Sequence, residues 1–178
     1  MRVLRRSEAR AMPWKNGGGV THEIAACPEG AGFDDIVWRL SMAEVASDGP
    51  FSPFRGIDRT LTLLEGAGIA LDFQGGSILL NPGAAPLTFP GEAAVSGRLV
   101  DGPILDLNVM TRRGASSHQV IELGPGALTP PGTVALVARE RAGIGEAVLD
   151  AGDSILSPDP DGVVVTAGRL LAVIVRIA

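Results

Sequence analysis

The chain has 178 residues, of which 46% are hydrophobic and 20% are charged, and this balance indicates a globular protein and excludes a largely disordered one. No apolar stretch approaches the roughly 20 residues that a membrane-spanning helix needs, so we expect no membrane partner. The net charge is −5 and the densest basic spots are two arginine pairs, which argues against nucleic-acid binding because phosphates need a basic stripe.

The N-terminal segment and the cysteine content indicate the compartment. Residues 1–8 lack the apolar core and the small-residue cleavage site of a signal peptide, so we expect a cytoplasmic protein. The one cysteine, Cys27, cannot form a disulfide within the chain, and we expect it to pack as a small apolar residue.

Most of the predicted elements are short strands. A helical candidate covers residues 7–12 and is followed by Pro13, which cannot continue a helix. The later segments are punctuated by 24 glycines and 13 prolines, a pattern typical of an all-β barrel or sandwich. Strands are expected at residues 37–45, 59–65, 69–73, 77–80, 94–99, 104–110, 119–123, 134–139, 146–149, 154–156, 163–166 and 170–177.

A faint internal repeat predicts two units. Residues 75–79 resemble residues 152–156, and a second register, which conflicts with the first, relates the same two parts of the chain. Together they indicate two related β units, a larger one over residues 1–113 and a smaller one over residues 114–178.

The run from Pro13 to Ile24 places Trp14, Lys15 and Asn16 directly before three glycines. Glycines leave backbone N–H groups unshielded, while an indole plane, a cation and an amide suit a small, planar, anionic molecule. In the alternative interpretation Trp14 packs in the core beside a glycine bulge, Lys15 is solvated, and Asn16 caps the glycine turn. The sequence leaves both interpretations open.

Arg39 lies within a predicted strand and shares a face with Ser41. In a fold whose strands line a barrel, an inward-facing arginine must be paired, and a carboxylate is its natural partner. That carboxylate belongs either to a ligand or to the chain itself, where Glu23, Asp58 and Asp106 are the candidates.

Two further strands carry polar candidates. Asp58 and Arg59 open a strand, where they form either a local pair that stabilises the turn or part of a ligand site. Asn108 shares a face with Asp106, and such a polar pair either lines a pocket or lies on the solvated outer face of a sheet.

His22 shares a face with Ile24, opposite Glu23. A histidine in such a place is either a satisfied core residue or, with a carboxylate nearby, a group for acid–base chemistry. No nucleophile is recognisable in the chain, so we assign no catalytic residue.

Four blocks are distinctive when taken together, namely residues 13–24, 38–45, 49–59 and 101–111. On these blocks the chain resembles the HutD/Ves family of bacterial proteins, specifically over most of residues 1–113. The resemblance implies a cupin-type double-stranded β-helix in two copies, a bicupin. It also implies an association with histidine utilisation, in which such proteins are suspected of binding an intermediate such as urocanate and limiting pathway output.

Metal binding is the next question that the resemblance raises, because many cupin enzymes hold a divalent metal through two or three histidines and a carboxylate. This chain has no His-x-His motif, and His22 and His118 fall in different predicted units. An all-carboxylate site of Glu23, Asp58 and Asp106 stays formally open, but we expect no metal and no cofactor.

Two functional hypotheses follow. The first is a metal-free bicupin that binds a small anionic metabolite and acts in regulation. The second is an isomerase or hydrolase that acts on a related metabolite, with His22 and Glu23 as acid–base candidates. A homodimer is a further expectation. The ligand-binding candidates are Trp14, Lys15, Asn16, Arg39, Ser41, Arg59 and Asn108, and the secondary candidates are His22, Glu23, Asp58 and Asp106.

Overall fold

The structure is a computed structural model that describes residues 2–157 and 162–178. These residues form antiparallel strands and one short 3-10 helix, η1 (Arg6–Glu8), so the predicted all-β class is confirmed. Within the described ranges, no helix is long and apolar enough to cross a membrane. Contacts divide the chain into a large unit, Arg10–Ala115, and a small unit made of Ser116–Ala178 and the segment that ends at Ala9.

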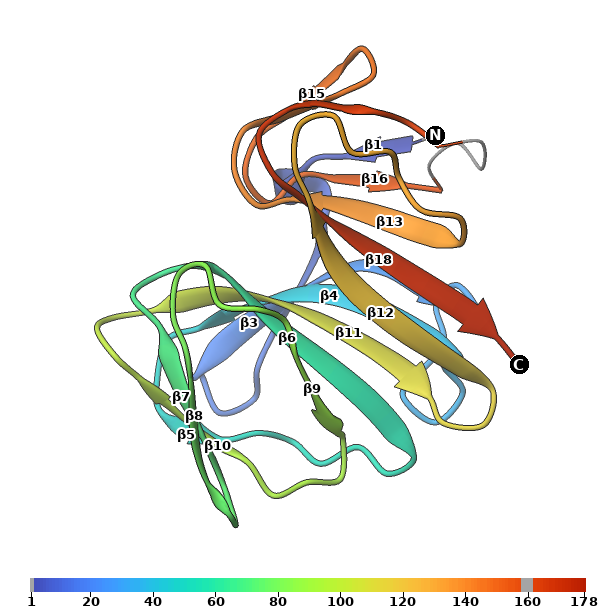
Figure 1. Ribbon diagram of the computed structural model, residues 1–178. Coiled ribbons are helices and arrows are strands. Elements are labelled where there is room, and N and C mark those ends of the chain that lie inside the picture. Colours follow the sequence, from blue (N-terminus) through green and yellow to red (C-terminus); the bar gives the residue numbers. More distant parts are fainter. Residues whose placement is uncertain (1, 158–161) are drawn as a thin grey trace. The chain divides into compact units, whose positions relative to one another are not determined.

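The large unit contains two antiparallel sheets, drawn from blue to yellow-green in Figure 1. The six-stranded sheet has the order β2 (Arg10–Pro13), β3 (Gly19–Cys27), β4 (Trp38–Val45), β11 (Ile104–Arg112), β6 (Ile57–Glu65), β9 (Leu87–Pro90). The four-stranded sheet has the order β5 (Gly49–Pro50), β10 (Ser96–Leu99), β7 (Ile69–Phe73), β8 (Gly76–Leu80). One apolar cluster joins Val45 and Leu61 of the first sheet to Ile69 and Leu71 of the second, so the two inner faces enclose the core of this unit.

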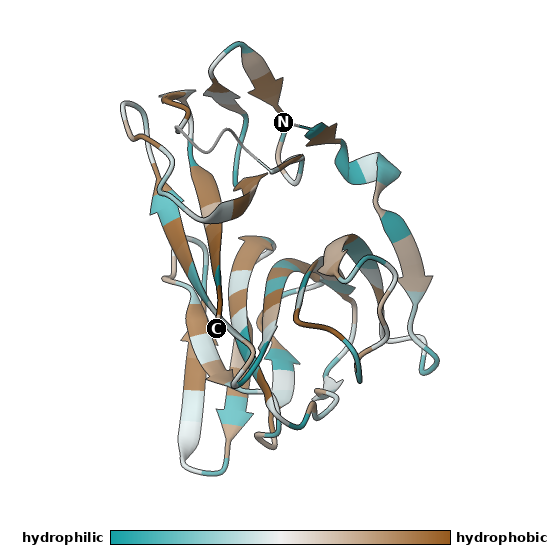
Figure 2. Cartoon of the chain, turned by 90° about the vertical axis from the view of Figure 1, so that its right-hand side faces the viewer, coloured by the Kyte–Doolittle hydropathy of each residue, from teal (hydrophilic) through white to brown (hydrophobic). Residues whose placement is uncertain are grey.

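The small unit is also built from two antiparallel sheets around a core. Its five-stranded sheet has the order β1 (Arg2–Leu4), β16 (Ser154–Leu156), β13 (Thr133–Ala138), β18 (Leu170–Ile177), β12 (Ser116–Leu123). Its three-stranded sheet has the order β15 (Ala147–Leu149), β14 (Ala142–Ile144), β17 (Val165–Ala167). Leu136 and Ile155 of the larger sheet pack with Ile144 and Val165 of the smaller one. Among the described residues each sheet is open at its edges, and brown apolar bands alternate with paler ones along several strands (Figure 2).

The predicted helix over residues 7–12 is wrong. Only Arg6–Glu8 forms a helical turn, and Arg10–Pro13 becomes strand β2, which pairs with β3 at the edge of the six-stranded sheet. Because β2 is an edge strand and Pro13 is its last residue, the missing N–H of the proline costs no ladder bond in the middle of the sheet.

Residues 2–9 make their contacts with the small unit, whereas the sequence division groups them with residues up to 113. Strand β1 pairs with β16, with Arg2 opposite Leu156, and the Arg5 guanidinium donates to Asp153 at 2.6 Å. About 150 residues separate these partners in the sequence, so no local sequence pattern could predict that they pair. The contacts change from the large unit to the small unit again between Ala115 and Ser116.

Candidate functional site

The large unit contains a cavity of about 530 Å³ that is open to solvent on one side and bordered by residues of both sheets. This volume lies within the range of sites that bind small molecules, roughly 300–1,000 Å³. The six-stranded sheet contributes the floor, and the lining residues from it include Thr21, Arg39, Ser41, Ala43, Arg59, Leu61, Asp106, Asn108 and Met110. The turn before β3 and the loop around β5 form the walls, from which Trp14, Phe51 and Phe54 reach the cavity.

Strand register explains why the polar side chains of the floor converge. Asn108 on β11 lies opposite Ser41 on β4, while Met110 lies between Arg39 on β4 and Arg59 on β6. Because alternate residues of a strand share a face, these side chains and that of Asp106 all point to the cavity side. All seven predicted ligand-binding residues line the cavity, namely Trp14, Lys15, Asn16, Arg39, Ser41, Arg59 and Asn108.

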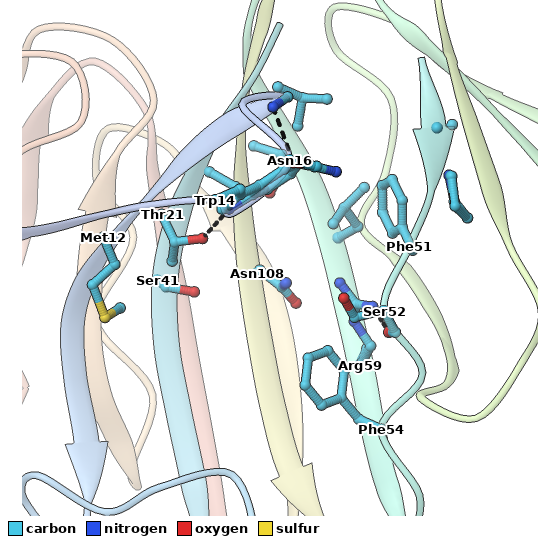
Figure 3. Close-up of a pocket in the computed structure, with 18 of the residues that line it drawn as sticks. Met12, Trp14, Asn16, Thr21, Ser41, Phe51, Ser52, Phe54, Arg59 and Asn108 are labelled. Atoms are coloured by element: carbon cyan, nitrogen blue, oxygen red, sulfur yellow. Dashed lines mark hydrogen bonds between the residues drawn. The ribbon is translucent and has the colours of Figure 1, made fainter. Parts of the chain in front are cut away.

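The glycine run seats Trp14 at the cavity wall. Its indole Nε1–H donates to Thr21 Oγ1 at 2.8 Å (Figure 3), and its backbone N–H donates to the Gly19 carbonyl at 2.9 Å. A Cβ on Gly19 would collide with the Glu44 carbonyl and lie 3.1 Å from the indole ring, so only glycine allows this approach. Trp14 packs on the core cluster, as the alternative interpretation expects, and it also lines the cavity.

Asn16 and Lys15 lie at the rim. Asn16 Oδ1 accepts from the Gly18 N–H at 3.0 Å, so its carbonyl oxygen caps the glycine turn as the alternative interpretation expects. Lys15 is exposed beside it, where its ammonium supplies a positive charge at the cavity mouth.

Arg39 has an internal carboxylate partner. Its Nε donates to Glu23 Oε2 at 2.7 Å, and its guanidinium lies 4.8 Å from the centre of the Phe33 ring. Only 7% of the Arg39 side chain is exposed, so this ion pair is largely shielded from water. Of the partners that the sequence leaves open for Arg39, the structure selects Glu23, which occupies one edge of the guanidinium.

Arg59 is held differently. Its guanidinium carbon lies 5.3 to 5.4 Å from the ring centres of Phe51, Phe54 and Phe89, and one terminal nitrogen donates to the Ser52 carbonyl at a long 3.5 Å. Its Nε–H is buried and has no hydrogen-bond partner. Burial lowers the pKa of Arg59 to about 10, although the charge of Asp106 opposes this, so the side chain is still a cation at neutral pH.

Asp106 and Asn108 face the same cavity from β11. Asp106 is 1% exposed and Asn108 is 9% exposed, and the Oδ1 atom of each has no hydrogen-bond partner. Burial raises the pKa of Asp106 to about 7, against the opposing effect of Arg59. In the described part of the chain, five buried side-chain polar atoms lack a partner, and three of them lie on residues that line this cavity.

Asp58 and Arg59 do not form the local pair that the sequence suggests. Their side chains point to opposite faces of β6, and Asp58 accepts instead from Arg113 at 2.6 Å. Adjacent residues of a strand diverge in this way because the side-chain period is two. Asp58 therefore lies outside the cavity.

His22 and Glu23, the acid–base candidates of the enzyme hypothesis, diverge for the same reason. His22 Nε2 lies 3.2 Å from Glu44 Oε1, whereas Glu23 contacts Arg39. Neither residue is among those that line the cavity. The structure thus gives His22 a carboxylate neighbour but places the pair away from the candidate site.

The residues present do not fit a cupin-type metal ion. Glu23, Asp58 and Asp106, the carboxylates of the formally open site, each face a different arginine, and His22 and His118 belong to different units. Across the described residues, no group of three or more histidine, cysteine, aspartate or glutamate side chains is arranged to hold a metal.

Comparison with known proteins identifies the family. Residues 6–167 match the HutD family. The chain belongs to the HutD family. A Pseudomonas putida relative, described as an uncharacterized 21.2 kDa protein in the hutC 3′ region, is 42% identical over 112 residues, which cover 62% of this chain and 57% of that protein. The chain thus spans less than two thirds of the length of this curated relative.

Two solved structures are similar to the chain over almost its whole length. HutD from Pseudomonas fluorescens SBW25 superimposes with a TM-score of 0.86 at 29% identity and covers 99% of this chain and 98% of its own. A conserved protein of unknown function from Pseudomonas aeruginosa PAO1 gives a TM-score of 0.82 at 30% identity, covering 98% of this chain and 97% of its own. The fold of this HutD-family protein is therefore shared with these two structures.

The aromatic wall is the part of the site that sequence reasoning did not assign. Phe33, Phe51 and Phe54 line the cavity around the two arginines. For Phe51 and Phe54 the signal in the sequence was the aromatic segment 51–54, which lies in one of the family blocks but has no strand-like alternation to orient it, whereas Phe33 lies outside those blocks. Loop residues of this kind take their direction from tertiary packing.

Proposed function

We propose that this HutD-family protein is a metal-free binding protein for a small planar metabolite with a carboxylate, such as urocanate, and that it acts in the regulation of histidine utilisation. The observation that carries the proposal is Arg59. A cation that is 5% exposed, enclosed by three aromatic rings and left with an unpaired Nε–H offers a binding position to an anion.

The other lining residues suit the remainder of such a ligand. The indole of Trp14 offers a flat face for a planar ring, and Ser41 and Asn108 offer polar atoms on the cavity floor. Lys15 at the rim adds a positive charge that favours the approach of an anion. Arg39 contributes less to this proposal, because Glu23 already neutralises it.

The regulatory part of the proposal rests on family context. The Pseudomonas putida relative is described as lying in the hutC 3′ region, and the solved relative from Pseudomonas fluorescens is named HutD. The two-copy cupin architecture is proposed on similar grounds. In its favour, each unit joins a larger and a smaller antiparallel sheet around one apolar core.

Isothermal titration calorimetry with urocanate tests the proposal. We expect saturable binding to the purified protein, and Arg59→Met should weaken it by at least about tenfold, because losing a hydrogen bond to a charged group costs roughly 1.5–3 kcal/mol. The matched control is Arg98→Met, since Arg98 pairs with Asp72 and does not line the cavity. Absence of any heat change or thermal shift with millimolar urocanate would contradict the proposal.

A further inference from the structure

The three unpaired polar atoms of the cavity differ in kind. Arg59 Nε is a hydrogen-bond donor, whereas the Oδ1 atoms of Asp106 and Asn108 are acceptors. A bare carboxylate satisfies only the first of them. It brings no hydrogen to the two oxygens, and a buried acceptor without a donor is costly.

The placement of these atoms follows from the sheet. Asp106 and Asn108 are two residues apart on β11 and share its inner face, so their attachment points lie roughly 7 Å apart along the strand. Arg59 projects from β6, the strand beside β11. In Figure 3 Asn108 lies between Arg59 on one side and Ser41 and Thr21 on the other. A ligand anchored at Arg59 therefore extends over the acceptors of β11 before it reaches Trp14.

Charge balance points the same way. Glu23 neutralises Arg39, and an ionised Asp106 offsets Arg59 in the buried part of the cavity. Asp48, which also lines the cavity, accepts from the Leu99 N–H, and Lys15 lies at the rim. An added carboxylate leaves this interior with an excess of negative charge, and a ligand N–H group that donates to Asp106 stabilises the ionised side chain in that setting.

We propose that Asp106, assisted by Asn108, determines ligand specificity by accepting a hydrogen bond from an N–H group, so that the site selects molecules that combine a carboxylate with a nitrogen heterocycle. This inference rests on the proposed function, because it assumes that Arg59 receives the carboxylate. Under this proposal the ligand needs an N–H donor as well as a carboxylate. A pocket that only binds anions would accept any planar carboxylate, whereas this site would bind one without an N–H donor less tightly.

Two probes of matched shape test the inference. Urocanate carries an imidazole on an acrylate, and trans-3-phenylacrylate carries a phenyl ring on the same acrylate. In calorimetry at pH 8 with the full chain, we expect urocanate to bind at least about tenfold more tightly than phenylacrylate. Asp106→Asn should weaken urocanate binding and strengthen phenylacrylate binding, because the nearly isosteric amide removes the negative charge beside the carboxylate.

The opposite shifts of the two probes separate a specificity role from a structural one. If Asp106 only holds Arg59 in place, Asp106→Asn weakens both probes equally, which overturns the inference. The same substitution at Asp72, whose carboxylate pairs with Arg98 outside the cavity, is the control and should leave the preference unchanged. Asn108→Leu supplies a second variant that should also reduce the preference, should Asp106→Asn fail to fold.

The failure of this inference is distinguishable from that of the proposed function. If the unmodified protein binds both probes equally and Arg59→Met abolishes both, the role of Asp106 is overturned. The carboxylate site at Arg59 is then still supported. No binding of either probe overturns both proposals.

Discussion

Arg59 places a buried positive charge in the cavity, which an apolar core would not contain. Removing an ion from water costs several kcal/mol, and contacts with aromatic faces return only about 0.5–2 kcal/mol. The three phenylalanines around Arg59 and the long bond to Ser52 therefore leave its charge incompletely compensated. Buried charged groups without a full set of partners cluster at functional sites. Arg59 is therefore a stronger candidate for binding a ligand than Arg39, which is paired with Glu23.

Asp106 makes a pH dependence of stability testable at the same scale. Its pKa is about 7 in the folded protein against an ordinary value of 3.8. Between about pH 4 and pH 7 the folded state keeps a proton that the unfolded chain has lost, so the contribution of this group to stability falls as the pH rises and is constant above pH 7.

Asp106→Asn should therefore be more stable than the unmodified protein at pH 8, by up to a few kcal/mol, and this advantage should vanish near pH 4. Urea unfolding between pH 4 and pH 8.5 measures it. Asp72→Asn is expected to be less stable than the unmodified protein at pH 8, because Arg98 lowers the pKa of Asp72 to about 2. Parallel stability curves for Asp106→Asn and the unmodified protein would contradict the assignment.

At the scale of elements, the first residue of β3 belongs to the glycine run and contacts Trp14 in the cavity wall. Strand β3 begins at Gly19, which lies opposite Val45 of β4 and directly beneath the Trp14 ring. The strand is thus able to pair closely with β4 only because no side chain intervenes at this position. The position of Trp14 in the cavity wall depends on the same contact.

Gly19→Ala should destabilise the protein by about 1–3 kcal/mol, since the new methyl group overlaps the Glu44 carbonyl and presses on the indole. Urea unfolding measures the loss, and calorimetry should show weaker urocanate binding as Trp14 is displaced. Gly32→Ala is the matched control, because a Cβ there meets nothing within 4 Å, and its effect should stay within about 0.5 kcal/mol. Equal effects of the two substitutions would count against the steric explanation.

Most strands were predictable from the sequence, and the helix predicted at residues 7–12 was the exception. Alternation over residues 37–45 and 104–110 placed Arg39 with Ser41 and Asp106 with Asn108, and all four line the cavity. The predicted helix at residues 7–12 failed because pairing with β3 outweighs a weak local preference.

At the scale of the whole molecule, the chain crosses between its units twice. The segment before Arg10 belongs to the small unit, the chain then builds the whole large unit, and it returns at Ser116. In the small unit, β1 covers one edge of β16, and Arg5 bonds to the buried carboxylate of Asp153.

Removal of residues 2–9 should accordingly loosen the small unit and spare the candidate site. Hydrogen exchange followed by mass spectrometry should show faster exchange in β16, whose edge loses its partner, and little change in β4 or β11. Urocanate binding should persist in the shortened chain. Faster exchange in β4 and β11 with unchanged β16 would contradict the division of the chain.

The sequence by itself determined the all-β class, the family, and which side chains of the main strands share a face. These follow from short-range properties, namely a side-chain period of two and distinctive blocks of contiguous residues. Only the tertiary structure decided that Glu23 pairs with Arg39, that Asp58 turns away to Arg113, and that Arg59, Asp106 and Asn108 keep unpaired atoms. Those outcomes depend on how β3 pairs with β4 and on the place of β11 between β4 and β6. Pairing between strands sets which side chains meet, and no local pattern encodes it.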